Sequence, residues 1–190
     1  MALHRHRHDP SKNLVGFIVG DVEYAVAIER VREIANPLEV VPLPHAPESV
    51  VGVADYRGEV VPVVDLRMRF GLIAAELTRK TKWIVIDVRD RLSPRGVADE
   101  STVRHDGRLV ALVVDSVTEV FGTGGADMRP APSLGGGGAT RGIGAVTTHG
   151  KALVFVLDAA RLRELTEPLA AAGRIGSEAS VHSLSAGPTT

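Results

Sequence analysis

The feature that most constrains this fold is an internal repeat, in which one pattern of residues occurs twice in the same order. In residues 21–34 the pattern reads D-x-x-Y and then V-R-E-I, and in residues 107–120 it returns as G-x-x-V and then V-T-E-V. A repeat of this kind predicts two copies of one small structural unit rather than a single large one.

A hairpin signal repeats in the same way. In each copy two glycines frame an apolar segment, and a second apolar run follows and ends in an aspartate. Glycine suits a tight reversal between strands, and an aspartate after the second strand can cap a short helix. The repeated residues are Gly52, Gly58 and Asp65 in the first copy and Gly144, Gly150 and Asp158 in the second.

The apolar segments are short and rich in β-branched residues, and turn residues separate them at close spacing. This pattern predicts a mainly β protein with short helices, in which each copy forms a small antiparallel barrel of about five strands. Four prolines between residues 37 and 47 exclude a long helix or a central strand there. We expect strands over residues 14–19, 23–28, 50–54, 60–64, 83–88, 109–114, 117–121, 143–147 and 152–157.

Composition narrows the class of protein. The net charge of −1 argues against a nucleic-acid-binding protein, which normally carries a basic excess. The chain has no cysteine, so disulfides, thiolate metal sites and cysteine nucleophiles are excluded. No apolar run approaches the roughly 20 residues of a membrane span. These features predict a cytoplasmic protein.

The motifs that would indicate catalysis are incomplete. Ser116 lacks the flanking glycines of a nucleophile elbow, and outside the first residues the histidines show no metal-ligand spacing. The glycine run at residues 135–138 is not followed by the lysine of a phosphate-binding loop. A dinucleotide fingerprint beginning at Gly142 fails because Thr147 takes the place of its third glycine. We therefore expect no catalytic residue, no metal and no cofactor.

Asp65 and Asp87 each end an apolar strand, where a phosphoryl-accepting or metal-binding carboxylate often lies. The alternative is a helix cap for Asp65 and a simple strand-end charge for Asp87. Because Asp158 repeats the placement of Asp65, capping explains both of these residues with one cause and is the favoured interpretation.

The hairpin at residues 50–64 places Arg57 and Gly58 in its turn. Gly58 provides the positive φ that a tight turn needs, which leaves the Arg57 guanidinium in water and open to a partner. On the residues alone, an exposed arginine at a turn is most often a solubilising tip.

Residues 52–67, GVADYRGEVVPVVDLR, closely resemble the signature of the CheW-like family of bacterial chemotaxis adaptors, which commonly reads N-L-R-G-x-x-x-P-x-x-D-L. Two positions depart from it, with Asp55 in place of the usual Asn and Tyr56 in place of the usual Leu. The resemblance extends to residues 20–34, 128–132 and 142–146, and covers the chain from Leu14 to about Leu165.

The resemblance implies a fold of two SH3-like five-stranded barrels packed side by side. Within a CheW-like domain at residues 14–170, we expect the first barrel at about 14–80 and the second at about 81–165, with strand exchange between them left open. Residues 1–13 are expected to form a disordered arm and residues 171–190 a flexible tail.

The resemblance also implies a function: a non-catalytic cytoplasmic adaptor at membrane-associated receptor arrays. Its partners would be a methyl-accepting chemoreceptor and the CheW-like regulatory domain of a CheA-type histidine kinase. The implied receptor-binding residues are Ile28, Val31, Glu33 and Arg57, although ordinary strand burial explains Ile28 almost equally well. The alternatives are a scaffold for a receptor-kinase array of pili or gliding, and a small-molecule-binding β-barrel.

Overall fold

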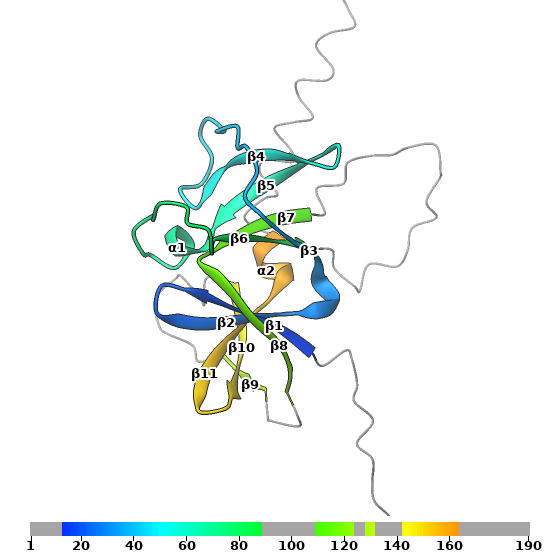
Figure 1. Ribbon diagram of the computed structural model, residues 1–190, viewed down its shortest axis with the longest axis vertical. Coiled ribbons are helices and arrows are strands. Elements are labelled where there is room, and N and C mark those ends of the chain that lie inside the picture. Colours follow the sequence, from blue (N-terminus) through cyan, green and yellow to red (C-terminus); the bar gives the residue numbers. More distant parts are fainter. Residues whose placement is uncertain (1–12, 89–108, 124–127, 132–141, 164–190) are drawn as a thin grey trace, which may run out of the picture.

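The computed structural model describes residues 13–88, 109–123, 128–131 and 142–163, which form a mainly β structure with two short α-helices and one 3-10 helix, η2 (Ile28–Arg30) (Figure 1). The strands predicted from apolar runs are present, with ends that shift by one to a few residues. The expected arm and tail lie outside the described residues, except for Asn13, which begins β1. The strands are β1 (Asn13–Val19), β2 (Val22–Ala27), β3 (Val31–Ala35), β4 (Val50–Tyr56), β5 (Glu59–Asp65), β6 (Lys82–Asp87), β7 (Leu109–Val114), β8 (Ser116–Gly122), β9 (Arg129–Pro130), β10 (Ile143–His149) and β11 (Ala152–Leu157), and the helices are α1 (Leu66–Arg69) and α2 (Ala159–Arg163).

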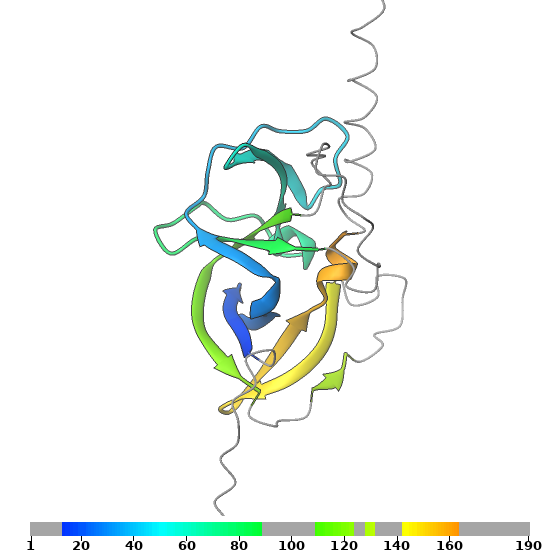
Figure 2. The ribbon, with the colours of Figure 1, turned by 90° about the vertical axis from the view of Figure 1, so that its right-hand side faces the viewer.

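The strands form two curled sheets that lie one above the other in Figures 1 and 2. One sheet has six strands in the order β8-β1-β2-β11-β10-β9, and the other has five in the order β3-β6-β7-β5-β4. The predicted fold class is therefore confirmed. The six-stranded sheet exceeds the expected five because the two-residue strand β9 pairs with β10.

The repeat is visible in the strand order. If β1 to β5 are equated with β6, β7, β8, β10 and β11, the order β3-β6-β7-β5-β4 becomes β8-β1-β2-β11-β10, which is the order of the other sheet without β9. The pairings agree as well, since β5 lies parallel to β7 and its counterpart β11 lies parallel to β2.

Each copy gives its first two strands to the sheet of the other copy. β1 and β2 pair with strands of the second copy, and β6 and β7 pair with strands of the first. The sheets thus do not divide the chain near residue 80, where we expected one barrel to end and the next to begin. The physical reason is that apolar patterning identifies strands and their faces but not their partners. The two sheets are built by the strand exchange between copies that the sequence analysis left open.

The core has three parts, because most strands bury both faces. One cluster fills the inside of the five-stranded sheet around Trp83, and another fills the inside of the six-stranded sheet around Phe121. The largest cluster lies between the sheets and takes residues from both, among them Phe17, Ile84 and Leu112. Burial on both faces explains why strands such as β6 and β7 are nearly continuous apolar runs.

The proline-containing segment after β3 helps to close the five-stranded sheet. Val41 and Val53 exchange backbone hydrogen bonds of 2.8 and 2.9 Å, which joins this segment to the outer strand β4. Gly52 makes the approach possible, since a Cβ on it would overlap the carbonyl oxygen of Val41. The segment thus contributes a single bridge rather than a strand, as its prolines predict.

Candidate binding site at the tip of the β4–β5 hairpin

The β4–β5 hairpin ends in a two-residue turn formed by Arg57 and Gly58. Tyr56 and Glu59 are its last paired residues, and the φ angles of Arg57 and Gly58 are 56° and 81°. Positive φ at both central positions is the type I′ geometry that matches the twist of paired strands. The sequence analysis assigned the positive φ to Gly58 alone, whereas Arg57 adopts it too, at a conformational cost of roughly 1–2 kcal/mol.

The side chain of Asp55 stabilises this turn. Its carboxylate oxygen Oδ1 accepts a hydrogen bond of 2.7 Å from the backbone N–H of Gly58. The family signature has Asn here, and an amide oxygen could accept the same bond. The departure at Asp55 therefore keeps the acceptor that the turn uses and adds a negative charge at an exposed tip.

Three side chains meet at the tip, and we call Glu33, Tyr56 and Arg57 the hairpin-tip cluster. Arg57 Nη2 lies 2.6 Å from Glu33 Oε2, and the Tyr56 hydroxyl donates a hydrogen bond to the same oxygen. The Arg57 guanidinium carbon lies 5.4 Å from the centre of the Tyr56 ring, within cation–π range. Arg57 is nevertheless 73% exposed, so the cluster orients its guanidinium without removing it from solvent.

Tyr56 differs from its neighbours in the cluster because its ring is buried. Only 8% of the residue is exposed, and it packs in the cluster around Trp83. Burial raises the pKa of Tyr56 above 10.0, and the hydrogen bond to the Glu33 carboxylate raises it further. The hydroxyl is therefore a stable donor to Glu33 at neutral pH.

The structure brings together only two of the four residues implied for receptor binding. Glu33 and Arg57 are in contact, whereas Ile28 and Val31 are partly buried and pack against the core between the sheets. The exposed apolar side chains on the strands of the cluster are instead Ile34 of β3 and Val60 of β5, at 41% and 59% exposure. Sequence reasoning treated Tyr56 only as a departure from the signature, although an aromatic residue next to a turn arginine is itself a signal for a cation–π contact.

Asp65, the last residue of β5, and Asp158, the residue after β11, each accept hydrogen bonds from the helix that follows. Asp65 Oδ1 accepts from the backbone N–H groups of Arg67 at 2.7 Å and Met68 at 3.3 Å, and Asp158 Oδ1 accepts from Ala160 at 3.0 Å. Asp87, at the end of β6, lies 3.9 Å from the guanidinium of Arg32.

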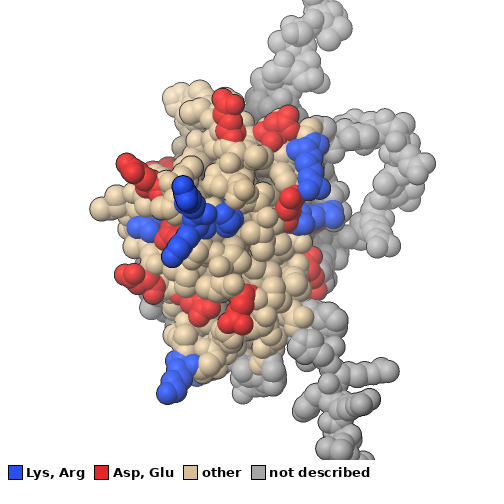
Figure 3. Space-filling model, in the orientation of Figure 1, with Lys and Arg blue, Asp and Glu red and all other residues tan. Residues whose placement is uncertain are grey.

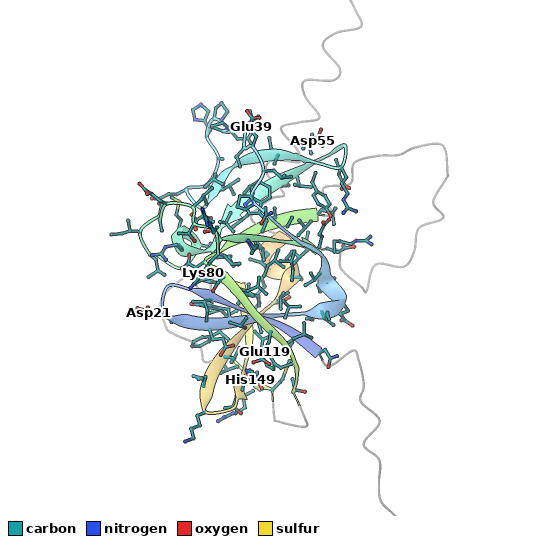
Figure 4. The ribbon with its side chains drawn as sticks, viewed as in Figure 1. Asp21, Glu39, Asp55, Lys80, Glu119 and His149 are labelled. Carbon is teal, nitrogen blue, oxygen red and sulfur yellow. The ribbon has the colours of Figure 1, made fainter. Side chains whose placement is uncertain are left out.

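The second hairpin brings a histidine close to two glutamates, and Figure 4 shows His149 beside Glu119. His149 precedes Gly150 as Arg57 precedes Gly58, and its ring nitrogens lie 3.8 Å from Glu119 and 3.9 Å from Glu23. In the repeat, Glu119 corresponds to Glu33. His149 is the last paired residue of β10, opposite Ala152, and so occupies the place of Tyr56. Gly150 and Lys151 form the second turn. Both copies therefore have a glutamate close to a side chain at the hairpin end, but only in the first is that side chain an arginine within the turn itself.

Charge at the first tip is mixed in sign. In Figure 3 basic and acidic side chains lie next to one another at the hairpin end, and charges of both signs are spread over the rest of this face.

Within the described ranges, no group of three or more His, Cys, Asp or Glu is placed to hold a metal ion. Among those same residues, no helix has the length and apolarity that crossing a bilayer requires. These features define a duplicated, mainly β module that carries an oriented, exposed arginine at one hairpin tip.

Comparison with known proteins identifies which module this is. Residues 13–167 match the family model of the CheW-like domain. The chain is 35% identical over 130 residues to a chemotaxis protein CheW from Rhizobium meliloti, covering 68% of this chain and 73% of that one. It is 32% identical over 118 residues to a chemotaxis protein CheW from Helicobacter pylori, covering 62% of this chain and 61% of that one.

A solved structure shows the same fold. The crystal structure of the scaffolding protein TtCheW from Thermoanaerobacter tengcongensis matches with a TM-score of 0.62 and 21% identity, covering 82% of this chain and 90% of that one. The match to the family model and the 35% identity to the first relative show that the chain belongs to the CheW-like family. It is a non-catalytic adaptor of chemotaxis signalling.

Proposed function

We propose that this adaptor acts in the cytoplasm at receptor arrays, where it links a methyl-accepting chemoreceptor to a CheA-type histidine kinase, and that the hairpin-tip cluster contacts the receptor. The observation that carries this assignment is the state of Arg57. It is held in a left-handed conformation and bonded to Glu33, yet its side chain is 73% exposed. Strained residues that the surrounding structure maintains are often found at functional sites.

The chemistry of arginine suits a helical receptor tip. Its planar fork presents five N–H donors, and the contact with Glu33 uses only one edge of it. The remaining donors can bind a carboxylate or backbone carbonyl groups at the end of a helical hairpin. Val60, which is 59% exposed and pairs with Asp55 next to the turn, adds exposed apolar area. Mixed charge at the tip favours orientation and partner choice over non-specific attraction.

The kinase domain would bind a separate surface. The support for this is the architecture, because two equivalent units in one rigid body offer distinct faces. Holding receptor and kinase on one body raises their effective concentration and fixes their relative orientation. A change in receptor conformation could then bias the kinase between active and inactive states through differential contacts.

The test uses Arg57→Asn, because asparagine before glycine is the preferred type I′ pair and should keep the turn folded. Binding would be measured by calorimetry to a receptor hairpin fragment and, separately, to the kinase regulatory domain. We expect the variant to bind the receptor at least tenfold more weakly and the kinase domain as the wild type does. Arg79→Ala, at an exposed position of the segment between α1 and β6, is the matched control.

Unchanged receptor affinity in Arg57→Asn would contradict the assignment of this surface. A parallel loss of both partners, with an intact unfolding transition, would contradict the separation of the two surfaces.

A further inference from the structure

Tyr56 makes two of the three contacts within the hairpin-tip cluster, one to Glu33 and one to Arg57, although the family signature has leucine at its position. We propose that Tyr56 is a positioning residue, which fixes the Arg57 guanidinium for the partner by holding Glu33 through its hydroxyl and by supporting the guanidinium with its ring. This inference deepens the proposed function and rests on it.

The ring of Tyr56 is an immobile support. With 8% exposure it packs among Ala54, Val61 and Trp83 inside the five-stranded sheet. A side chain fixed by core packing keeps the position of its polar end as well. The hydroxyl therefore has a fixed position near the surface, where it can order the otherwise flexible side chains of Glu33 and Arg57.

Two contacts transmit this constraint to Arg57. The hydroxyl donates to Glu33 Oε2, and that oxygen also lies 2.6 Å from Arg57 Nη2. The ring adds the second contact, since the guanidinium carbon lies 5.4 Å from its centre. Leucine would fill much of the same core volume and supply neither contact. The glutamate would then be oriented by Arg57 alone, and both side chains would gain rotamer freedom.

If the Arg57 side chain is already ordered in the free protein, less side-chain conformational entropy is lost when the complex forms. Ordering a long side chain at an interface is a recognised cost of association, and a side chain that is already ordered avoids part of it. The residue thus acts on affinity without touching the partner. This distinguishes Tyr56 from Arg57, which would make the contact itself.

The experiment compares Tyr56→Phe, which keeps the ring, with Tyr56→Leu, which restores the family residue. We expect receptor-fragment binding to weaken by three- to tenfold in Tyr56→Phe and further in Tyr56→Leu, with kinase-domain binding unchanged. The direct readout is the Arg57 Nε–Hε signal in the NMR spectrum of the free protein. This signal should be resolved in the wild type and averaged toward the value of a mobile arginine in both variants.

A double-mutant cycle separates positioning from a structural role. In a Glu33→Ala background, which removes the acceptor altogether, Tyr56→Phe should change receptor affinity by less than twofold, because the path through the carboxylate is already cut. Equal losses in the two backgrounds, or an Arg57 signal unaffected by Tyr56→Phe, would overturn the inference. The proposed function fails by a different result, namely unchanged receptor affinity in Arg57→Asn, and the NMR readout stays informative in that case.

Discussion

Arg67 and Asp115 join the two sheets at the point where the chain passes from one to the other. Asp115 lies between β7 of the five-stranded sheet and β8 of the six-stranded sheet, and its Oδ2 accepts a hydrogen bond of 2.7 Å from Arg67 Nη1 at the start of α1. The same oxygen accepts one of 2.7 Å from the backbone N–H of Gly20, in the β1–β2 turn. One carboxylate thus ties together three segments that the strand exchange brings into proximity.

Removing this carboxylate should destabilise the protein more than removing its arginine partner. We expect Asp115→Ala to lower the free energy of unfolding by about 2 kcal/mol and Arg67→Ala by about 1 kcal/mol, since only the first change also leaves the Gly20 N–H without its acceptor. The measurement is urea unfolding followed by tryptophan fluorescence of Trp83. Arg67→Ala also removes the hydrogen bond of 2.9 Å from Arg67 Nε to the Ile73 carbonyl, at an exposed site. Equal effects of the two substitutions would show that the Gly20 bond contributes no more than this one.

Two glycines of the first hairpin should respond very differently to alanine. At Gly52, with φ of 152°, a Cβ would overlap the backbone of Val41, so Gly52→Ala must break the bridge to β4 and should cost about 3 kcal/mol or more. At Gly58 no atom lies within 4 Å of an added Cβ, so Gly58→Ala should cost about 1 kcal/mol from its positive φ alone. Thermal unfolding of both variants tests this ranking, and a milder effect at Gly52 would contradict the packing described for the segment after β3.

Loss of the Asp65 carboxylate should weaken the start of α1. We expect Asp65→Ala to lower the free energy of unfolding by about 1 kcal/mol and Asp65→Asn to have a much smaller effect, because the amide oxygen can still accept from Arg67 and Met68. Chemical denaturation of the pair measures this difference. An asparagine variant as unstable as the alanine variant would mean that the charge, rather than the cap, is what matters.

The two tyrosines of the chain should make stability depend on pH in alkaline solution. Burial raises the pKa of both Tyr24 and Tyr56 above 10.0 in the folded state. The folded state therefore keeps its protons where the unfolded chain begins to lose them, so this contribution is complete below pH 10 and is lost as the pH rises through the folded-state pKa values.

Absorbance of tyrosinate measures this directly. At pH 10 the native protein should show much less ionisation than the protein in denaturant, which should be close to half ionised. Native ionisation equal to that of the denatured chain would contradict the burial of the two hydroxyl groups. In Tyr56→Phe, the alkaline loss of stability should be shallower.

The sequence predicts the strands of this fold better than their partners. Residues 109–114 and 152–157 are recognisable strands because β-branched side chains dominate them, and the turns at Gly58 and Gly150 are recognisable because glycine permits positive φ. That β1 and β2 pair outside their own copy has no local signature, because either copy offers an equally apolar edge. In the structure, the exchange places strands of both copies around one common core.

The candidate site, too, could be predicted from the sequence only in part. Arg57 could be placed at a turn from its glycine neighbour, but its contact with Glu33 depends on how the sheet curls to bring β3 toward the end of β4. Ile28 and Val31 follow the family signature and yet pack mainly against the core. The role proposed for Tyr56 depends on the burial of its ring and on its hydrogen bond to Glu33, neither of which a residue pattern reports.

The most direct test of an adaptor with separate faces is whether one molecule holds both partners at once. Sedimentation velocity of an equimolar mixture with a receptor hairpin fragment and the kinase regulatory domain should give a single ternary species, and Arg57→Asn should reduce it to the binary complex with the kinase domain. Displacement of one partner by the other in the wild-type mixture would show a shared surface and would contradict the account.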